Sequence, residues 1–124
     1  MSATWAEEWV RRYVEAWNTN EPQAIADLFS SDARYFTEPH ARPWAGRDDI
    51  VGQWLERRDE PGDTAFEFSV LVATDAVAIV RGQTRYKSTG VLYENLWEIY
   101  SGDGSTCHKF VEWWMENKST DDGP

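Results

Sequence analysis

The chain has 124 residues and a formal net charge of −10, from 12 Lys and Arg against 22 Asp and Glu. This length suits one domain with a core of useful size. The acidic balance argues against nucleic acid or an anionic membrane surface as a partner, because both are bound through basic residues. No apolar run approaches the roughly 18 residues of a membrane span. The single cysteine allows no internal disulfide, and we therefore expect a cytoplasmic protein.

The first 30 residues predict two helices. Aromatic side chains recur every four residues after a Thr4–Glu7 capping box, which predicts a helix with one broad apolar face. They are Trp5, Trp9, Tyr13 and Trp17. Residues 18–20 end this helix, and Pro22 is tolerated in the first turn of a short second helix.

The rest of the chain predicts mostly strands. A turn at residues 30–32 precedes a strand at 33–38, an ordered loop at 39–46 and a third helix over 47–59. Alternating apolar residues then predict four longer strands, at 64–73, 76–87, 91–100 and 106–116. Helices first and antiparallel strands after predict an α+β domain with three N-terminal helices packed on one sheet. We expect a single domain over residues 1–117 and a polar tail over 118–124.

Five short sequence words occur in an order and at a spacing that resemble the SnoaL-like proteins of the nuclear transport factor 2-like superfamily. They are RYVEAWN at 12–18, ADLFSSDA at 26–33, GRDDI at 46–50, ENLWEI at 94–99 and FVEWWM at 110–115. The resemblance implies a cone, in which a strongly bent sheet wraps round the helices and leaves a pocket at its open end. It does not fix an activity, since this fold serves isomerases, cyclases, epoxide hydrolases, dehydratases and non-catalytic proteins.

The resemblance also implies a homodimer, because the outer sheet face of such proteins often pairs. The last predicted strand fits this expectation, since it is largely apolar on both faces. Val111, Trp113 and Met115 would face outward, and Phe110, Glu112 and Trp114 would face the cavity.

Two candidate catalytic residues follow from similarity to the ketosteroid isomerases of the superfamily. Tyr13 lies where those enzymes carry an oxyanion-stabilising tyrosine, and a phenol donates to an enolate without losing its own proton at pH 7. Glu38 precedes Pro39 at a predicted strand end, where they carry the aspartate that shuttles the proton. The alternatives are a core tyrosine and a solvated loop glutamate. At the position of their second acid this chain has Trp97, which either donates its N–H or fills the pocket.

Glu112 is a third candidate catalytic residue, near the strand position where epoxide hydrolases of the superfamily hold an acid. A buried carboxylate needs a partner or a raised pKa. Arg81 and Arg85, on a neighbouring strand, are the expected partners, and Asn95 is a further donor. We favour a structural Glu–Arg pair that closes the cone, with catalysis as the alternative.

Candidate ligand-binding residues are mostly aromatic. They are Trp9, Trp17, Trp54, His40, Asn95, Trp97, Phe110 and Trp114. A pocket lined by these aromatic rings suits a flat, small apolar molecule, although the same rings can instead fill the pocket at the open end of the cone. Two histidines are too few for a metal site, so neither a metal nor a cofactor is expected.

Two functions remain open from the sequence. The first is a cofactor-free isomerase, hydrolase or cyclase, with Tyr13 as the donor and Glu38 or Glu112 as the base. The alternative is a non-catalytic ligand-binding or dimeric interaction module of the same fold.

Overall fold

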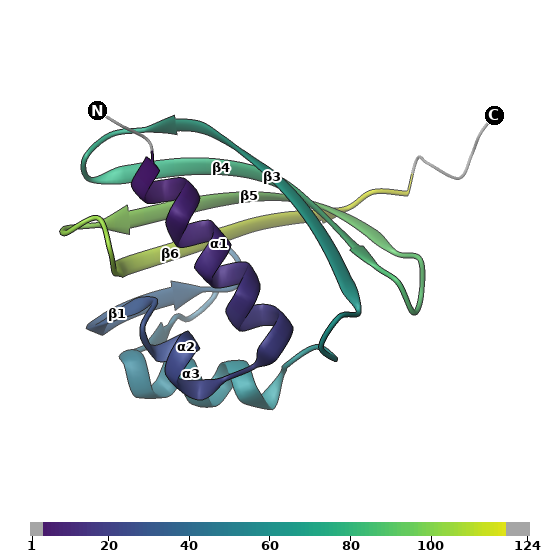
Figure 1. Ribbon diagram of the computed structural model, residues 1–124, viewed down its shortest axis with the longest axis horizontal. Coiled ribbons are helices and arrows are strands. Elements are labelled where there is room, and N and C mark those ends of the chain that lie inside the picture. Colours follow the sequence, from purple (N-terminus) through teal and green to yellow (C-terminus); the bar gives the residue numbers. More distant parts are fainter. Residues whose placement is uncertain (1–3, 119–124) are drawn as a thin grey trace.

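A six-stranded sheet curls round the long first helix, α1, which spans Thr4–Thr19 (Figure 1). The computed structural model describes residues 4–118 of the chain, without the Thr4 side chain. The capping contact predicted for Thr4 and most of the predicted tail therefore lie outside the described residues. Two shorter helices follow, α2 at Pro22–Ala26 and α3 at Arg47–Glu56. No helix within residues 4–118 combines the length and the apolar character that a membrane crossing requires.

The sheet has the strand order β2-β1-β6-β5-β4-β3. Its strands are β1 at Phe29–Phe36, β2 at Trp44–Ala45, β3 at Thr64–Ala73, β4 at Val77–Tyr86, β5 at Leu92–Ser101 and β6 at Cys107–Glu116. The β1–β6 pair is parallel and every other pair is antiparallel. The predicted α+β class, with three N-terminal helices on a mostly antiparallel sheet, is confirmed. The last four strands lie close to their predicted ranges.

The core lies between α1 and the concave face of the sheet (Figure 1). Trp9, on the buried face of α1, is fully enclosed and donates its indole N–H to the carbonyl of Leu28 at 2.9 Å. Opposite it, Phe110 and Ile99 project from the sheet and are also fully buried. The four-residue spacing of the aromatic residues therefore produces the packing face that the sequence predicts.

Gly82, in the middle of β4, allows an unusually close contact between strands. A Cβ atom at this position would lie 2.6 Å from two ring atoms of Phe66, which is well inside van der Waals contact. The absent side chain lets the Phe66 ring cross β4 and stack on Trp97, with ring centroids 5.0 Å apart.

Two predicted boundaries are wrong near the helical layer. The first strand begins at Phe29 rather than residue 33, because Phe29 pairs with Cys107 and the register shifts before Arg34. Residues 30–32 thus form an irregular part of the strand instead of a turn. The expected loop at residues 39–46 ends in the short strand β2, which pairs with β1.

The third helix ends earlier than predicted, at Glu56 instead of residue 59. Its last turn closes when the Arg57 N–H bonds to the carbonyls of Gln53 and Trp54. Asp59 therefore lies in the connection to β3, and its carbonyl accepts a hydrogen bond from the Asn20 side chain. Hydrogen bonds from Trp17 of α1 and from Asn20, just after α1, therefore hold Asp59 where the last helical turn was expected.

Candidate functional site

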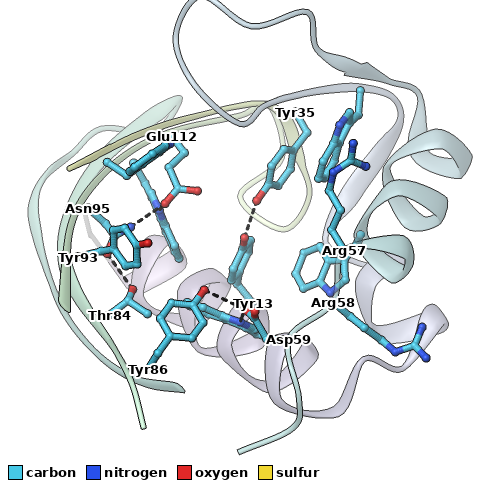
Figure 2. A pocket seen from close by; sticks show the side chains of 15 residues that line it. Tyr13, Tyr35, Arg57, Arg58, Asp59, Thr84, Tyr86, Tyr93, Asn95 and Glu112 are labelled. Carbon is cyan, nitrogen blue, oxygen red and sulfur yellow. Dashed lines mark hydrogen bonds between the residues drawn. The ribbon is translucent and has the colours of Figure 1, made fainter. Parts of the chain in front are cut away.

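A cavity of about 320 Å³ opens between the helices and the concave face of the sheet. Seen from close by, it has a polar wall on the strand side and aromatic rings around it (Figure 2). The lining residues come from most elements of the fold. They are Tyr13, Trp17, Tyr35, Trp44, Trp54, Arg57, Arg58, Asp59, Thr84, Tyr86, Tyr93, Asn95, Trp97, Glu112 and Trp114.

Glu112 supplies the carboxylate of the polar wall. The alternation of β6 turns it inward, and β5 presents two donors to it. Asn95 Nδ2 donates to Glu112 Oε2 at 2.7 Å, and Trp97 Nε1 donates to the same oxygen at 3.2 Å. The other oxygen, Oε1, accepts no hydrogen bond from the described residues, and the carboxylate points into the cavity (Figure 2).

Burial raises the pKa of Glu112 to about 6, although the hydrogen bonds from Trp97 and Asn95 oppose this rise. A carboxylate with such a pKa is largely ionised at neutral pH, yet it is a stronger base than an exposed glutamate. This is the range that general acid–base chemistry requires.

A third polar residue extends this wall to the next strand. The Thr84 hydroxyl on β4 donates to Asn95 Oδ1 at 2.8 Å, and both side chains are buried. Thr84, Asn95 and Glu112 thus form a chain of hydrogen bonds across three neighbouring strands (Figure 2).

Two phenols face this wall from the helical side. The hydroxyls of Tyr13 and Tyr35 lie 2.6 Å apart and point into the space that the Glu112 carboxylate faces (Figure 2). Burial raises the pKa of both tyrosines, and the nearby charge of Glu112 adds to this effect. Both phenols are therefore neutral at physiological pH and can donate hydrogen bonds.

A second carboxylate, Asp59, lies at the edge of the cavity. Its Oδ2 accepts hydrogen bonds from Trp17 Nε1 at 2.9 Å and from the Tyr86 hydroxyl at 3.1 Å. Burial, together with the charge of Asp59, raises the pKa of Tyr86. These bonds tie α1 and β4 to the segment after α3, so they fix the shape of this end of the cavity.

The structure brings most of the residues singled out from the sequence to one cavity. Those that line it are Tyr13, Trp17, Trp54, Asn95, Trp97, Glu112 and Trp114. Trp97 is almost fully buried, whereas Trp114 is 50% exposed at the rim. The indole of Trp97 both packs in the core and donates to Glu112, so the two alternatives weighed for this residue occur together.

Four predicted site residues lie elsewhere. Glu38 and His40 are exposed in the bend after β1, and Glu38 lines a groove on the outer sheet face. Because β1 already ends at Phe36, this bend leaves the sheet before it reaches the cavity. Trp9 and Phe110 are fully buried and do not line the cavity, since they fill the space between α1 and the sheet.

The expected ion pair of Glu112 with Arg81 or Arg85 is wrong. Thr84 faces inward from β4, so the alternation of the strand turns both arginines to the outer face, where Arg81 lines the groove. Among the described residues the partners of Glu112 are neutral, namely Asn95 and Trp97. Of the three partners expected for Glu112 from the sequence, Arg81, Arg85 and Asn95, only Asn95 bonds to it among the described residues.

Sequence reasoning missed several lining residues. The most important are Tyr35, Asp59, Thr84, Tyr86 and Tyr93. A signal existed for Thr84, which lies between the outward Gln83 and Arg85 and is a polar residue after three inward positions, 78, 80 and 82, that are apolar or small. No local signal existed for Asp59, because its role depends on where the helix ends. Within residues 4–118, no three His, Cys, Asp or Glu side chains are grouped so that they could hold a metal ion.

Comparison with known proteins agrees with this architecture. No curated protein matches the chain. Among solved structures, the chain is similar to an NTF-2 like protein of unknown function from Burkholderia xenovorans, with a TM-score of 0.74 and 13% identity over 98% of this chain and 88% of that one. A putative ketosteroid isomerase from Kribbella flavida gives a TM-score of 0.71 and 19% identity over 98% and 84% of the two chains.

An LEH-like epoxide hydrolase from M. tuberculosis is also similar, with a TM-score of 0.63 and 12% identity over 90% of this chain and 84% of that one. At such identities these similarities concern the fold. The SnoaL-like domain matches residues 10–118, which is nearly the whole chain. The protein therefore belongs to the SnoaL-like domain family, within the NTF2-like fold.

Proposed function

We propose that this protein is a cofactor-free enzyme that transfers a proton on a small, flat, largely apolar molecule. The observation that carries the proposal is that one carboxylate, Glu112, and one pair of phenols, Tyr13 and Tyr35, border the same aromatic cavity. A base and a hydrogen-bond donor on opposite sides of a bound molecule are the parts that enolisation or a related proton transfer requires.

Glu112 is the base in this proposal. Its Oε1 is free of hydrogen bonds from the described residues, so it can approach a C–H group of the substrate or a water molecule. The hydrogen bonds to Oε2 hold the carboxylate in one orientation. A pKa of about 6 supports this role, because the residue is ionised and still basic at neutral pH.

Tyr13 is the donor in this proposal, and its hydroxyl is hydrogen-bonded to that of Tyr35. Only one proton lies between the two oxygens, so the second hydroxyl proton of the pair remains available for a developing negative charge on the substrate. A raised pKa keeps that proton on the phenol at physiological pH. Glu38 has no part in the proposal, since it lies outside the cavity.

The ligand class follows from the cavity walls. A volume of about 320 Å³ is at the small end of the range for small-molecule sites. Tryptophan and tyrosine rings make up most of the walls, and such rings favour flat ligands through stacking.

The proposal can be tested with 5-nitrobenzisoxazole, a flat probe with one acidic C–H group. A carboxylate that removes the C3 proton drives cleavage of the N–O bond and releases 2-cyano-4-nitrophenolate, which is followed by its absorbance. We expect turnover by the wild-type protein that increases as pH rises through about 6. Glu112→Gln should lower the rate on the order of 10²-fold, since the general base is lost.

Glu38→Gln is the matched control, because it removes a carboxylate outside the cavity and should leave the rate unchanged. Equal rates for Glu112→Gln and the wild-type protein would overturn the proposal. Quenching of tryptophan fluorescence by the probe, without turnover that depends on Glu112, would instead favour the non-catalytic ligand-binding alternative.

We also propose that two copies of the chain pair through the outer sheet face. A groove on this face contains four large exposed apolar side chains, Leu71, Trp113, Trp114 and Met115, with exposed fractions of 56%, 44%, 50% and 65%. Exposed apolar groups gathered in this way are typical of an interface. The same groove holds Arg81 and Glu94, and Glu94 Oε1 is buried without a hydrogen bond from the described residues.

A two-fold axis that passes between Arg81 and Glu94 would place Arg81 of one copy opposite Glu94 of the partner subunit, and the same contact would form twice. Light scattering after gel filtration should give the mass of a dimer for the wild-type protein. Trp113→Glu should give the mass of a monomer, while Thr19→Glu on α1 adds the same charge away from this face and should not. A wild-type monomer at all concentrations would contradict the proposal.

A further inference from the structure

The carboxylate of Glu112 is linked through Asn95 to Thr84, a side chain with which it shares no hydrogen bond. Thr84 on β4 bonds to Asn95 on β5, and Asn95 bonds to Glu112 on β6. The two hydrogen bonds measure 2.8 and 2.7 Å, so both are well formed. Thr84 is 3% exposed and Asn95 is 8% exposed, which leaves little room for water to replace either bond.

The direction of these bonds matters because a side-chain amide has two different ends. Its oxygen only accepts and its NH2 group only donates. If the amide of Asn95 were rotated by half a turn, its oxygen would face Glu112 Oε2 and two acceptors would oppose each other. The Thr84 hydroxyl donates to Oδ1, so the orientation in which Nδ2 faces the carboxylate has a partner at both ends of the amide.

We propose that Thr84 is a positioning residue that orients the Asn95 amide and so keeps Glu112 ionised with its second oxygen directed into the cavity. This inference rests on the proposed function, in which Glu112 is the base. Thr84 borders the cavity, but its hydroxyl is engaged with Asn95 and acts through it.

Removal of the hydroxyl should therefore change the acidity of Glu112. In Thr84→Val, Oδ1 of Asn95 loses its buried donor, so the orientation with Nδ2 toward the carboxylate leaves an unpaired amide oxygen and is favoured less strongly. A weaker donor to the charged form disfavours ionisation, so the pKa of Glu112 should rise above about 6.

Other groups that act on Glu112 stay in place in this variant. Trp97 donates to the same oxygen from β5. The tyrosines whose pKa responds to the charge of Glu112 are Tyr13 on α1, Tyr35 on β1 and Tyr86 on β4. The charged residues that border the same cavity are Arg57, Arg58 and Asp59, all from the segment after α3. Because none of these groups bonds to the Thr84 hydroxyl, we expect their positions to be unchanged in Thr84→Val, so that a shift in the pKa of Glu112 reports on the Asn95 amide.

The experiment follows the titration of Glu112 in the free protein, without any substrate. The reporter is the indole N–H resonance of Trp97 in nitrogen-15 spectra, because this N–H donates to Glu112 Oε2. In the wild-type protein the chemical shift of this resonance should change with pH, and the midpoint of that change should lie near pH 6. Thr84→Val should move the midpoint upward by roughly one pH unit, as expected when a hydrogen bond to a charged group is weakened.

Two variants serve as controls. Thr84→Ser keeps a hydroxyl at the same place and should restore the wild-type midpoint. Thr64→Val removes a buried hydroxyl from β3, outside the cavity, and should leave the midpoint unchanged. If Thr84→Val does not fold, Thr84→Ala removes the hydroxyl with less crowding and carries the same expectation.

A midpoint that is identical in Thr84→Val or Thr84→Ala and in the wild-type protein would overturn the inference. So would a Thr84→Ser variant that shifts as far as the variant without a hydroxyl. Neither result would affect the proposed base, since turnover of 5-nitrobenzisoxazole tests Glu112 directly. A wild-type midpoint near the ordinary value for an exposed glutamate would instead count against the proposed function itself.

Discussion

The indole of Trp97 and the carboxylate of Glu112 lie directly opposite each other in the β5–β6 pair, with Nε1 donating to Oε2 at 3.2 Å. This bond makes a core aromatic residue part of the polar wall. Trp97→Phe keeps an aromatic ring in the core and removes the donor.

We expect Trp97→Phe to raise the pKa of Glu112 above about 6, because a donor to the charged form is lost. The midpoint of the pH–rate profile with 5-nitrobenzisoxazole should rise by roughly one pH unit. Trp9→Phe is the control, since the Trp9 indole donates to the Leu28 carbonyl, whereas the described donors to Glu112 are Asn95 and Trp97. A midpoint that does not change in Trp97→Phe would contradict a direct role of this bond.

The buried carboxylate also predicts how stability depends on pH. The pKa of Glu112 is raised from 4.5 to about 6 on folding, so its contribution to stability is fully present below the unfolded value and is lost as pH rises through 6. Relative to Glu112→Gln, the wild-type protein should therefore lose about 2 kcal/mol between pH 4 and pH 7. Urea unfolding of both proteins at these pH values measures the difference, and a constant difference would refute the prediction.

The two phenols of the cavity should be energetically coupled. Tyr13→Phe or Tyr35→Phe leaves the other buried hydroxyl without its partner, and each should cost about 1–2 kcal/mol of unfolding free energy. The double variant should cost less than the sum of the single variants, because no hydroxyl is then left unpaired. Denaturant unfolding of the four proteins completes the cycle, and strictly additive costs would show that the hydroxyls do not act as a pair.

The close contact at Gly82 predicts a large effect from one added carbon. Gly82→Ala should destabilise the protein by about 1–3 kcal/mol, since the Phe66 ring must move away from β4. Gly52→Ala in α3 is the matched control, because an added Cβ meets no atom within 4 Å there. We expect this control to be neutral or stabilised by up to about 1 kcal/mol, as helix propensity favours alanine. Thermal unfolding of both variants tests the contrast.

Much of the fold was predictable, because periodicity depends on which face of each element is buried. The four-residue spacing along α1 and the alternation along β6 turn Tyr13 and Glu112 toward one cavity. Their catalytic roles remain predictions. Alternation along β4 also turns Arg81 outward, and the ion pair expected for Glu112 is wrong because two neutral donors on β5 satisfy the buried carboxylate instead.

The remaining parts of the site depend on where elements end, which local sequence determines poorly. Glu38 precedes a proline at an apparent strand end, yet β1 stops two residues earlier and the chain bends away from the cavity. Asp59 fits the end of a helix by composition, but its contacts with Trp17 and Tyr86 need a helix that is shorter. Both outcomes are set by packing between distant segments.

The hydrogen-bonded chain from Thr84 to Glu112 lies entirely within the last three strands, whereas the phenols belong to the first 35 residues of the sequence. The hairpins that carry the acid and its donors require only local pairing, so they can form before the helical layer closes over them. Until that layer closes, water reaches Glu112 and its pKa stays near that of an ordinary glutamate. The pKa of Glu112 therefore reports how completely α1 has closed over the sheet. A protein that opens transiently in this region would have a lower Glu112 pKa and hence a weaker base.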